Sequence, residues 1–161
     1  MDKLTFRLNN PIVEVLYSEH TASWFSANNG SISGTDPFYF FFFNTFTEMM
    51  ALLGNDWNTS TYVYTVYVDA PGQTGAGATG MAFLPEHDLK GLIGESNEPV
   101  DRWIGGLGHE LGHGFGLPHP PDGSTYWNSA IMGFGYITFP DAILTPSDKE
   151  MLLNSGFFFK K

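Results

Sequence analysis

The stretch from residue 108 to residue 119 reads Gly-His-Glu-Leu-Gly-His-Gly-Phe-Gly-Leu-Pro-His. Its first two histidines, His109 and His113, are four positions apart, so on a helix their rings lie on the same face. Two imidazoles placed in this way can bind one metal ion at about 2.0–2.1 Å. The stretch therefore predicts a metal-binding helix around which the fold is organised.

A third histidine, His119, follows His113 by six residues. A continuing helix would rotate it by about 240°, away from the first two. The chain must turn sharply instead, and Gly116 can adopt the left-handed conformation that such a turn needs. Pro118 then prevents the helix from resuming. We expect His109, His113 and His119 to hold Zn²⁺, with Glu110 beside them as a general base.

Composition limits the classes of partner. The chain has 161 residues, 17 acidic and 7 basic side chains, a net charge of −10 and no cysteine. This charge argues against nucleic acid as a partner. The lack of cysteine excludes disulfides, Cys-based zinc sites and thiol nucleophiles. The longest apolar run, Phe38 to Phe43, is far shorter than the roughly 20 residues that span a bilayer, so we expect no membrane insertion.

Hydrophobic periodicity and turn residues predict strands and helices within one α/β domain. The strands are expected at 4–8, 61–68 and 81–84, and the Gly-rich segment 69–80 is expected to be turn-like. The helices are expected at 36–54, at 97–114, and from Thr145, where Asp148 completes a capping box, to Gly156.

The spacing His-Glu-x-x-His-x-x-Gly-x-x-His resembles that of the metzincin clan of zinc endopeptidases. Members of the clan also carry a methionine in a tight turn beneath the metal, and Ser-Ala-Ile-Met-Gly at 129–133, with Met132, is similar to that Met-turn. The C-terminal segment from Leu144 is most similar to the matrixin group. Pro120, directly after the third histidine, is similar to the serralysin group, so the subfamily stays open.

This resemblance implies an α+β, zincin-like fold within a single catalytic domain, residues 1–161. A twisted, mostly parallel sheet with an antiparallel edge strand would pack on the central active-site helix, and residues 1–116 would form the N-terminal subdomain. Residues 117–161 would form a loop-rich C-terminal subdomain with the Met-turn and a closing helix. The resemblance also implies a monomeric enzyme that cleaves protein or peptide substrates.

The resemblance further implies where a substrate binds. An edge strand, expected at Gly80, Met81, Ala82 and Phe83, would pair with an extended peptide. Phe134, Gly135 and Ile137, which follow the methionine, would line an apolar pocket. Serralysins and astacins have a metal-reaching tyrosine where this chain has Phe134, so Tyr136 is the candidate for a metal-reaching or oxyanion-stabilising role.

Two other functions remain open. The chain could be a catalytically inert zinc-binding recognition module, although such a module would be expected to lose Glu110. It could also be a zinc hydrolase of a non-peptide amide. Residues 1–6 contain no apolar signal segment, and we expect a secreted protein whose signal or pro-segment lies outside this chain.

Overall fold

The computed structural model describes residues 4–29 and 36–160. Within these ranges it is a mixed α/β structure with five α-helices, a three-stranded sheet and a separate two-stranded pair. The helices are α1 Ala22–Phe25, α2 Phe40–Leu53, α3 Glu86–Leu92, α4 Val100–Gly114 and α5 Pro146–Asn154, with short 3₁₀ turns η1 Pro37–Tyr39, η2 Gly54–Asp56 and η3 Phe134–Thr138. The strands are β1 Leu4–Thr5, β2 Tyr64–Tyr67, β3 Ala76–Ala78, β4 Met81–Leu84 and β5 Phe159–Lys160.

The three-stranded sheet has the order β2-β4-β3. Strand β4 runs parallel to β2 and antiparallel to β3, so the sheet has the expected antiparallel edge strand but is not mostly parallel. The prediction of an edge strand at Gly80, Met81, Ala82 and Phe83 was wrong, because β4 is the central strand. The edge strand is β3, which lies within the segment expected to be turn-like, and Gly80 with φ +85° makes the turn between the two strands.

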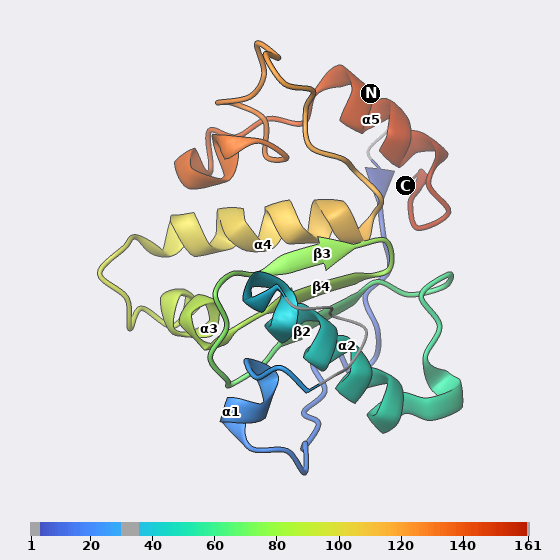
Figure 1. The fold of residues 1–161 in the computed structure, drawn as a ribbon. Coiled ribbons are helices and arrows are strands. Elements are labelled where there is room, and N and C mark those ends of the chain that lie inside the picture. Colours follow the sequence, from blue (N-terminus) through green and yellow to red (C-terminus); the bar gives the residue numbers. More distant parts are fainter. Residues whose placement is uncertain (1–3, 30–35, 161) are drawn as a thin grey trace.

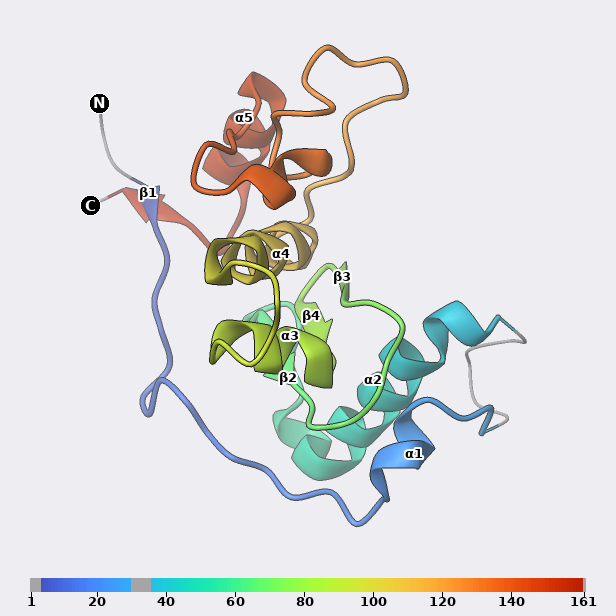
Figure 2. The same cartoon turned by 90° about the vertical axis from the view of Figure 1, so that its left-hand side faces the viewer.

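Helix α4 lies between the sheet and the C-terminal part of the chain (Figure 1). It covers one face of the sheet, α2 covers the opposite face, and α3 lies beside α4 at the ends of β2 and β4 (Figure 2). The core between α2 and the sheet contains Phe25, Phe41, Met49, Ala70 and Phe83. A second cluster of Leu117, Met132 and Leu152 lies on the other side of α4. Burial on two sides holds α4 in place despite its many glycines.

The three longer helices were predicted close to their observed bounds. The Asp36 side chain accepts a hydrogen bond from the Phe38 backbone ahead of α2, and Thr145 and Asp148 form the expected capping box of α5. The short helices α1 and α3 were not predicted. The strand expected at 81–84 ends just before Pro85, which is also the residue from which α3 begins.

The predicted strand at Leu4–Leu8 is shorter than expected and lies outside the main sheet. Only Leu4 and Thr5 form a strand, which pairs antiparallel with β5 near the other end of the chain. Phe6 then packs against Phe115 and Phe158, with ring centroids 5.4 and 5.6 Å apart. No helix in the described ranges is long and apolar enough to cross a membrane.

Candidate metal centre

His109 and His113 lie one turn apart on α4, and each ring is oriented by a backbone carbonyl. His109 Nδ1 donates to the Ile131 carbonyl at 2.8 Å, and His113 Nδ1 donates to the Leu117 carbonyl at 2.8 Å. A proton on Nδ1 leaves the lone pair of Nε2 free in a neutral imidazole. Both Nε2 atoms are therefore available as metal ligands, and their orientation is set by a second layer of contacts, as is usual for metal-binding histidines.

The turn that follows α4 brings His119 to the same place. Gly116 has φ +89°, its N–H donates to the His113 carbonyl, and the Leu117 N–H donates to the Gly112 carbonyl, each at 2.9 Å. This pair of bonds is a Schellman motif, the common way to end a helix at a left-handed glycine. The predicted left-handed turn at Gly116 is confirmed.

The three histidines together form a group that can hold a metal ion. His119 Nε2 lies 3.1 Å from His109 Nε2 and 3.0 Å from His113 Nε2. Ligand atoms at about 2.0–2.1 Å around a tetrahedral ion lie about 3.3–3.4 Å apart, so the spacing fits Zn²⁺ after small movements. Three protein ligands leave the fourth position of a tetrahedral ion for water or substrate.

The electrostatic environment keeps two of these ligands neutral. Burial lowers the pKa of His109 to about 4, against a smaller opposing effect of its hydrogen bond to Ile131. Burial also lowers the pKa of His113. A histidine must be deprotonated at the ligating nitrogen to bind a metal, so the fold prepares both residues for that role at neutral pH.

Glu110 lies next to the histidines and against the edge strand β3. Burial, with a smaller contribution from the negative charge of Asp88, raises its pKa from 4.5 to about 7, against the opposing effect of a hydrogen bond from the Gly77 backbone N–H. A carboxylate with a pKa near the working pH is suited to general acid–base catalysis. Glu110 therefore has the properties of a proton carrier.

Two glycines of the segment that includes β3 allow it to lie close to α4. A Cβ atom at Gly77 would lie 2.3 Å from the Glu110 carbonyl oxygen and 2.7 Å from His113 Cβ, and one at Gly75 would lie 3.4 Å from Glu110 Cγ. The absence of side chains therefore places the strand directly beside the candidate base. Sequence reasoning missed this role because the segment was expected to be a turn.

Replacing Gly77 by alanine should separate β3 from α4. The added Cβ meets backbone atoms of Glu110, which cannot move aside, so we expect a loss of about 1–3 kcal/mol in the free energy of unfolding, measured with urea. Gly156→Ala is the control, since nothing lies within 4 Å of its Cβ position. It should change stability by less than about 0.5 kcal/mol. Equal stability of the two variants would contradict the close approach.

In the metal-free protein, His109 and Glu110 should change the stability with pH in opposite directions. The folded pKa of His109 is about 4, below its unfolded value, so its contribution to stability is lost as pH falls from about 6.5 to 4. The folded pKa of Glu110 is about 7, above its unfolded value, so its contribution is lost as pH rises from about 4.5 to 7. Each effect is worth about 3 kcal/mol, and the two nearly cancel.

Single variants should therefore reveal slopes of opposite sign. On acidification from pH 7 to pH 4.5, the metal-free Glu110→Gln protein should lose about 3 kcal/mol of stability relative to wild type. Metal-free His109→Gln should gain a similar amount relative to wild type. Urea unfolding at both pH values in the presence of chelator measures these differences. Parallel pH profiles of all three proteins would show that neither group is perturbed.

The predicted Met-turn residue, Met132, is fully buried on the far side of α4. A Cβ atom at Gly112 would lie 2.2 Å from Met132 Sδ, so the helix and the methionine are in close contact between His109 and His113. Gly133 also requires a glycine, since a Cβ atom there would lie 2.2 Å from the Trp127 carbonyl oxygen. Gly133 has φ −109°, so a glycine is needed here because Trp127 is close and not because the backbone is left-handed.

Residues 134–137 lie within the 3₁₀ turn η3, beside α4. The Tyr136 ring is 5.1 Å from the His109 ring, so the candidate residue lies at the metal centre. Phe134 is half-exposed and packs on Trp127, which neighbours His119. Ile137 is also half-exposed.

The predicted apolar pocket of Phe134, Gly135 and Ile137 needs two corrections. Gly135 is buried, and a Cβ atom there would lie 2.4 Å from the Ser129 carbonyl oxygen, so it packs in the interior. Ile137 lines a different cavity, at the start of α4, which Phe134 does not line. Gly135 therefore contributes no side chain to a pocket wall, whereas Phe134 and Ile137, which are three residues apart in η3, are both half-exposed.

Comparisons with known proteins give one structural neighbour to report. No protein-family model matches the sequence, and no curated protein matches it. The fold is similar to a crystal structure of wild-type OgpA from Akkermansia muciniphila, with a TM-score of 0.58 and 19% sequence identity. The match covers 98% of this chain and 49% of OgpA, so the chain spans about half the length of that protein. At this identity the likeness shows a shared fold alone.

Proposed function

We propose that this chain is a zinc-dependent endopeptidase of the metzincin type. The observation that carries the proposal is the convergence of the Nε2 atoms of His109, His113 and His119 next to Glu110. Three neutral imidazoles with an open fourth position are typical of catalytic zinc. Buried Met132 behind the ligand helix adds to the resemblance from which the clan was inferred.

In this proposal Glu110 is the residue that moves protons. Bound zinc would supply a Lewis acid that makes water more acidic and polarises the substrate carbonyl. Glu110 takes a proton from water as the water oxygen bonds to the carbonyl carbon, and the peptide C–N bond then breaks as Glu110 gives that proton to the leaving nitrogen. The Gly77 N–H fixes the carboxylate during these transfers, and burial raises its affinity for a proton.

The substrate would bind as an extended strand along β3. This strand ends the sheet order β2-β4-β3, so its outer backbone groups have no neighbouring strand in the described structure. An extended peptide can add to such an edge through main-chain hydrogen bonds. Because Gly77 contacts Glu110 and His113, a peptide paired there would run past the metal ligands. The strand proposed to pair with the substrate is thus β3, and not the segment 80–83 that the sequence predicted.

Metal analysis combined with a peptide-library digest tests this function. We expect about one zinc per chain, cleavage of internal peptide bonds, loss of cleavage with a chelator, and recovery when zinc is restored. Zinc binding without cleavage of peptides or other amides would instead support an inert recognition module. Hydrolysis of simple amides without cleavage of any peptide would support the third candidate function.

A further inference from the structure

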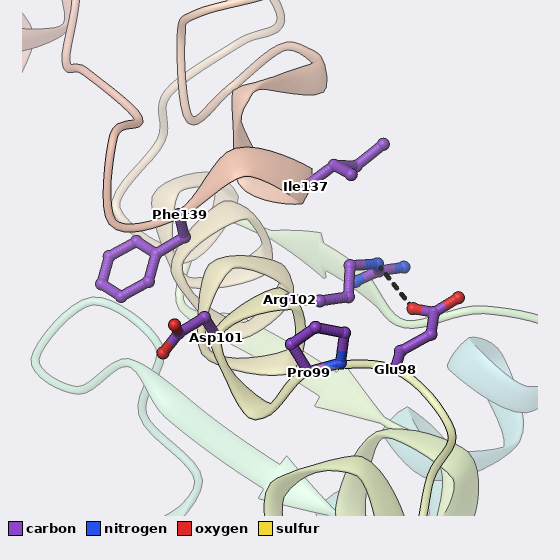
Figure 3. Close-up of a pocket in the computed structure, with 6 residues that line it drawn as sticks. All are labelled: Glu98, Pro99, Asp101, Arg102, Ile137 and Phe139. Atoms are coloured by element: carbon purple, nitrogen blue, oxygen red, sulfur yellow. Dashed lines mark ion pairs between the residues drawn. The ribbon is translucent and has the colours of Figure 1, made fainter.

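A cavity of about 550 Å³ lies at the N-terminal end of α4, on the side of Tyr136. Figure 3 shows the residues that line it, which are Glu98, Pro99, Asp101, Arg102, Ile137 and Phe139. Three of the six are charged, so the cavity differs from the apolar pocket that the sequence predicted for this region. Arg102 is the cation among them, and its Nε lies 3.5 Å from Glu98 Oε2.

The Arg102 side chain is held in place by aromatic contacts. Its guanidinium carbon lies 5.0 Å from the centre of the Trp103 ring and 4.9 Å from that of the Tyr136 ring, and the side chain is only 27% exposed. Stacking of this kind covers the faces of a guanidinium and leaves the N–H groups at its edge for hydrogen bonds. Arg102 is therefore an ordered donor at the wall of the cavity.

This donor lies close to the metal centre. Arg102 Nη1 lies 3.0 Å from the position that a Cβ atom of Gly106 would occupy, so the side chain extends along α4 toward His109. From Gly106 to His109 the helix rises by about 4.5 Å. Tyr136 bridges the two, since its ring contacts both the guanidinium and the His109 ring. A substrate bound at the histidines would therefore pass beside Tyr136, the residue that contacts Arg102.

Arg102 is the least exposed of the three charged residues that line the cavity. The Glu98 side chain is 58% exposed, and Asp101 is also exposed. Charges in water act at an effective dielectric constant of about 80 and those near protein atoms at about 20, a fourfold difference per charge. The half-buried guanidinium is therefore screened less by solvent than either exposed carboxylate, and the buried Asp88, whose Oδ1 lies 3.7 Å from the same Cβ position of Gly106, is a third carboxylate near it. Glu98, at 3.5 Å, is an exposed partner that another carboxylate can displace.

We propose that Arg102 is a specificity-determining residue, which selects substrates that place a carboxylate in this cavity next to the cleaved bond. The proposal rests on the proposed peptidase function. Glu98 occupies the edge of the guanidinium in the free protein and gives way to the substrate carboxylate. Ile137 and Phe139 provide apolar contacts for the aliphatic part of a glutamate side chain.

Internal competition between peptides tests the proposal. Peptides that differ only in Glu, Gln or Lys are mixed, with the varied residue at each of the three positions on either side of the cleaved bond. At one of these positions we expect kcat/KM for Glu to exceed that for Gln by about tenfold or more, which is typical of a hydrogen bond to a charged group. Lys should be the poorest, and high salt should reduce the differences.

Variants identify the residue responsible. Arg102→Gln should abolish the preference for Glu over Gln, Arg102→Lys should keep part of it, and Glu98→Gln should increase it. Lys149→Gln, which removes an exposed cation on α5, is the control and should leave the preference unchanged. Glu98→Gln also tests the proposal if the Arg102 variants fail to fold, because it leaves the aromatic contacts intact.

The outcomes separate this inference from the function on which it rests. If no peptide is cleaved, the proposed function fails. If peptides are cleaved without a preference for Glu at any position, or if Arg102→Gln slows all peptides equally, Arg102 only supports Tyr136 and the inference is overturned. A preference for Lys that fades with salt would show that Glu98 and Asp101 dominate the cavity.

Discussion

Replacing Glu110 by glutamine should lower kcat by about 10²- to 10⁴-fold while zinc remains bound. Glutamine has nearly the same shape as glutamate and can still accept the hydrogen bond from the Gly77 N–H, so β3 and α4 should keep their positions. It cannot take a proton from water at neutral pH. The expected loss is therefore one of proton transfer, without a loss of structure or of a metal ligand.

Three measurements distinguish this effect from a loss of folding or of metal. Single-turnover cleavage gives the rate, metal analysis gives the zinc content, and thermal unfolding with and without added zinc gives the stabilisation by the metal. Gly156→Ala, at a site with open space around it, should behave as wild type in all three. If the Glu110→Gln protein keeps more than about a hundredth of the wild-type rate, Glu110 is not the general base.

The parts of the fold that the sequence predicted well depend on local signals. The spacing of His109 and His113 defines one face of a helix, and the glycine at Gly116 adopts the left-handed conformation that brings His119 back. The capping residues of α5 likewise act within one turn. Interactions between residues close in sequence depend little on the rest of the fold, so these patterns could be interpreted without the structure.

The errors concern contacts between distant segments. Strand β3 has the sequence Ala-Gly-Ala, which has little strand propensity, and it forms a strand because Gly77 fits against Glu110 and His113. Strand β4 has the more strand-like sequence and was therefore taken for the edge. Its central place depends on pairing with both β2 and β3, an arrangement that the hydrophobic pattern of one strand does not contain.

Arg102 could have been recognised from its spacing on α4. Arg102, Gly106, His109 and His113 follow one another at intervals of four, three and four residues, which places them along one face of a helix. The predicted helix at 97–114 included Arg102, but the functional residues predicted on it began with His109, so the guanidinium was not among them. The contacts of Arg102 with Trp103 and Tyr136 could not be predicted, because Tyr136 is brought to α4 by η3.

Replacing His119 by alanine should remove zinc and activity together. This residue supplies the third Nε2 atom, 3.0–3.1 Å from the other two, and two imidazoles alone do not make a catalytic zinc site. Loss of an outer contact to a ligand typically costs 10- to 100-fold in metal affinity, so loss of the ligand itself should cost about 100-fold or more. His119 is exposed, so the metal-free fold should keep its stability.

Zinc retained after dialysis against a micromolar chelator measures this effect, and His20→Ala is the control. The His20 ring stacks on Trp24 at 3.8 Å and its Nε2 lies 3.5 Å from Glu48; His87 pairs with Asp88. Neither belongs to the group formed by His109, His113 and His119 within the described residues. Full zinc content in His119→Ala would therefore mean that water or a residue outside this group completes the site. Because Glu110→Gln should keep its zinc and His119→Ala should lose it, the pair separates the proton carrier from the ligand even though both variants are expected to be inactive.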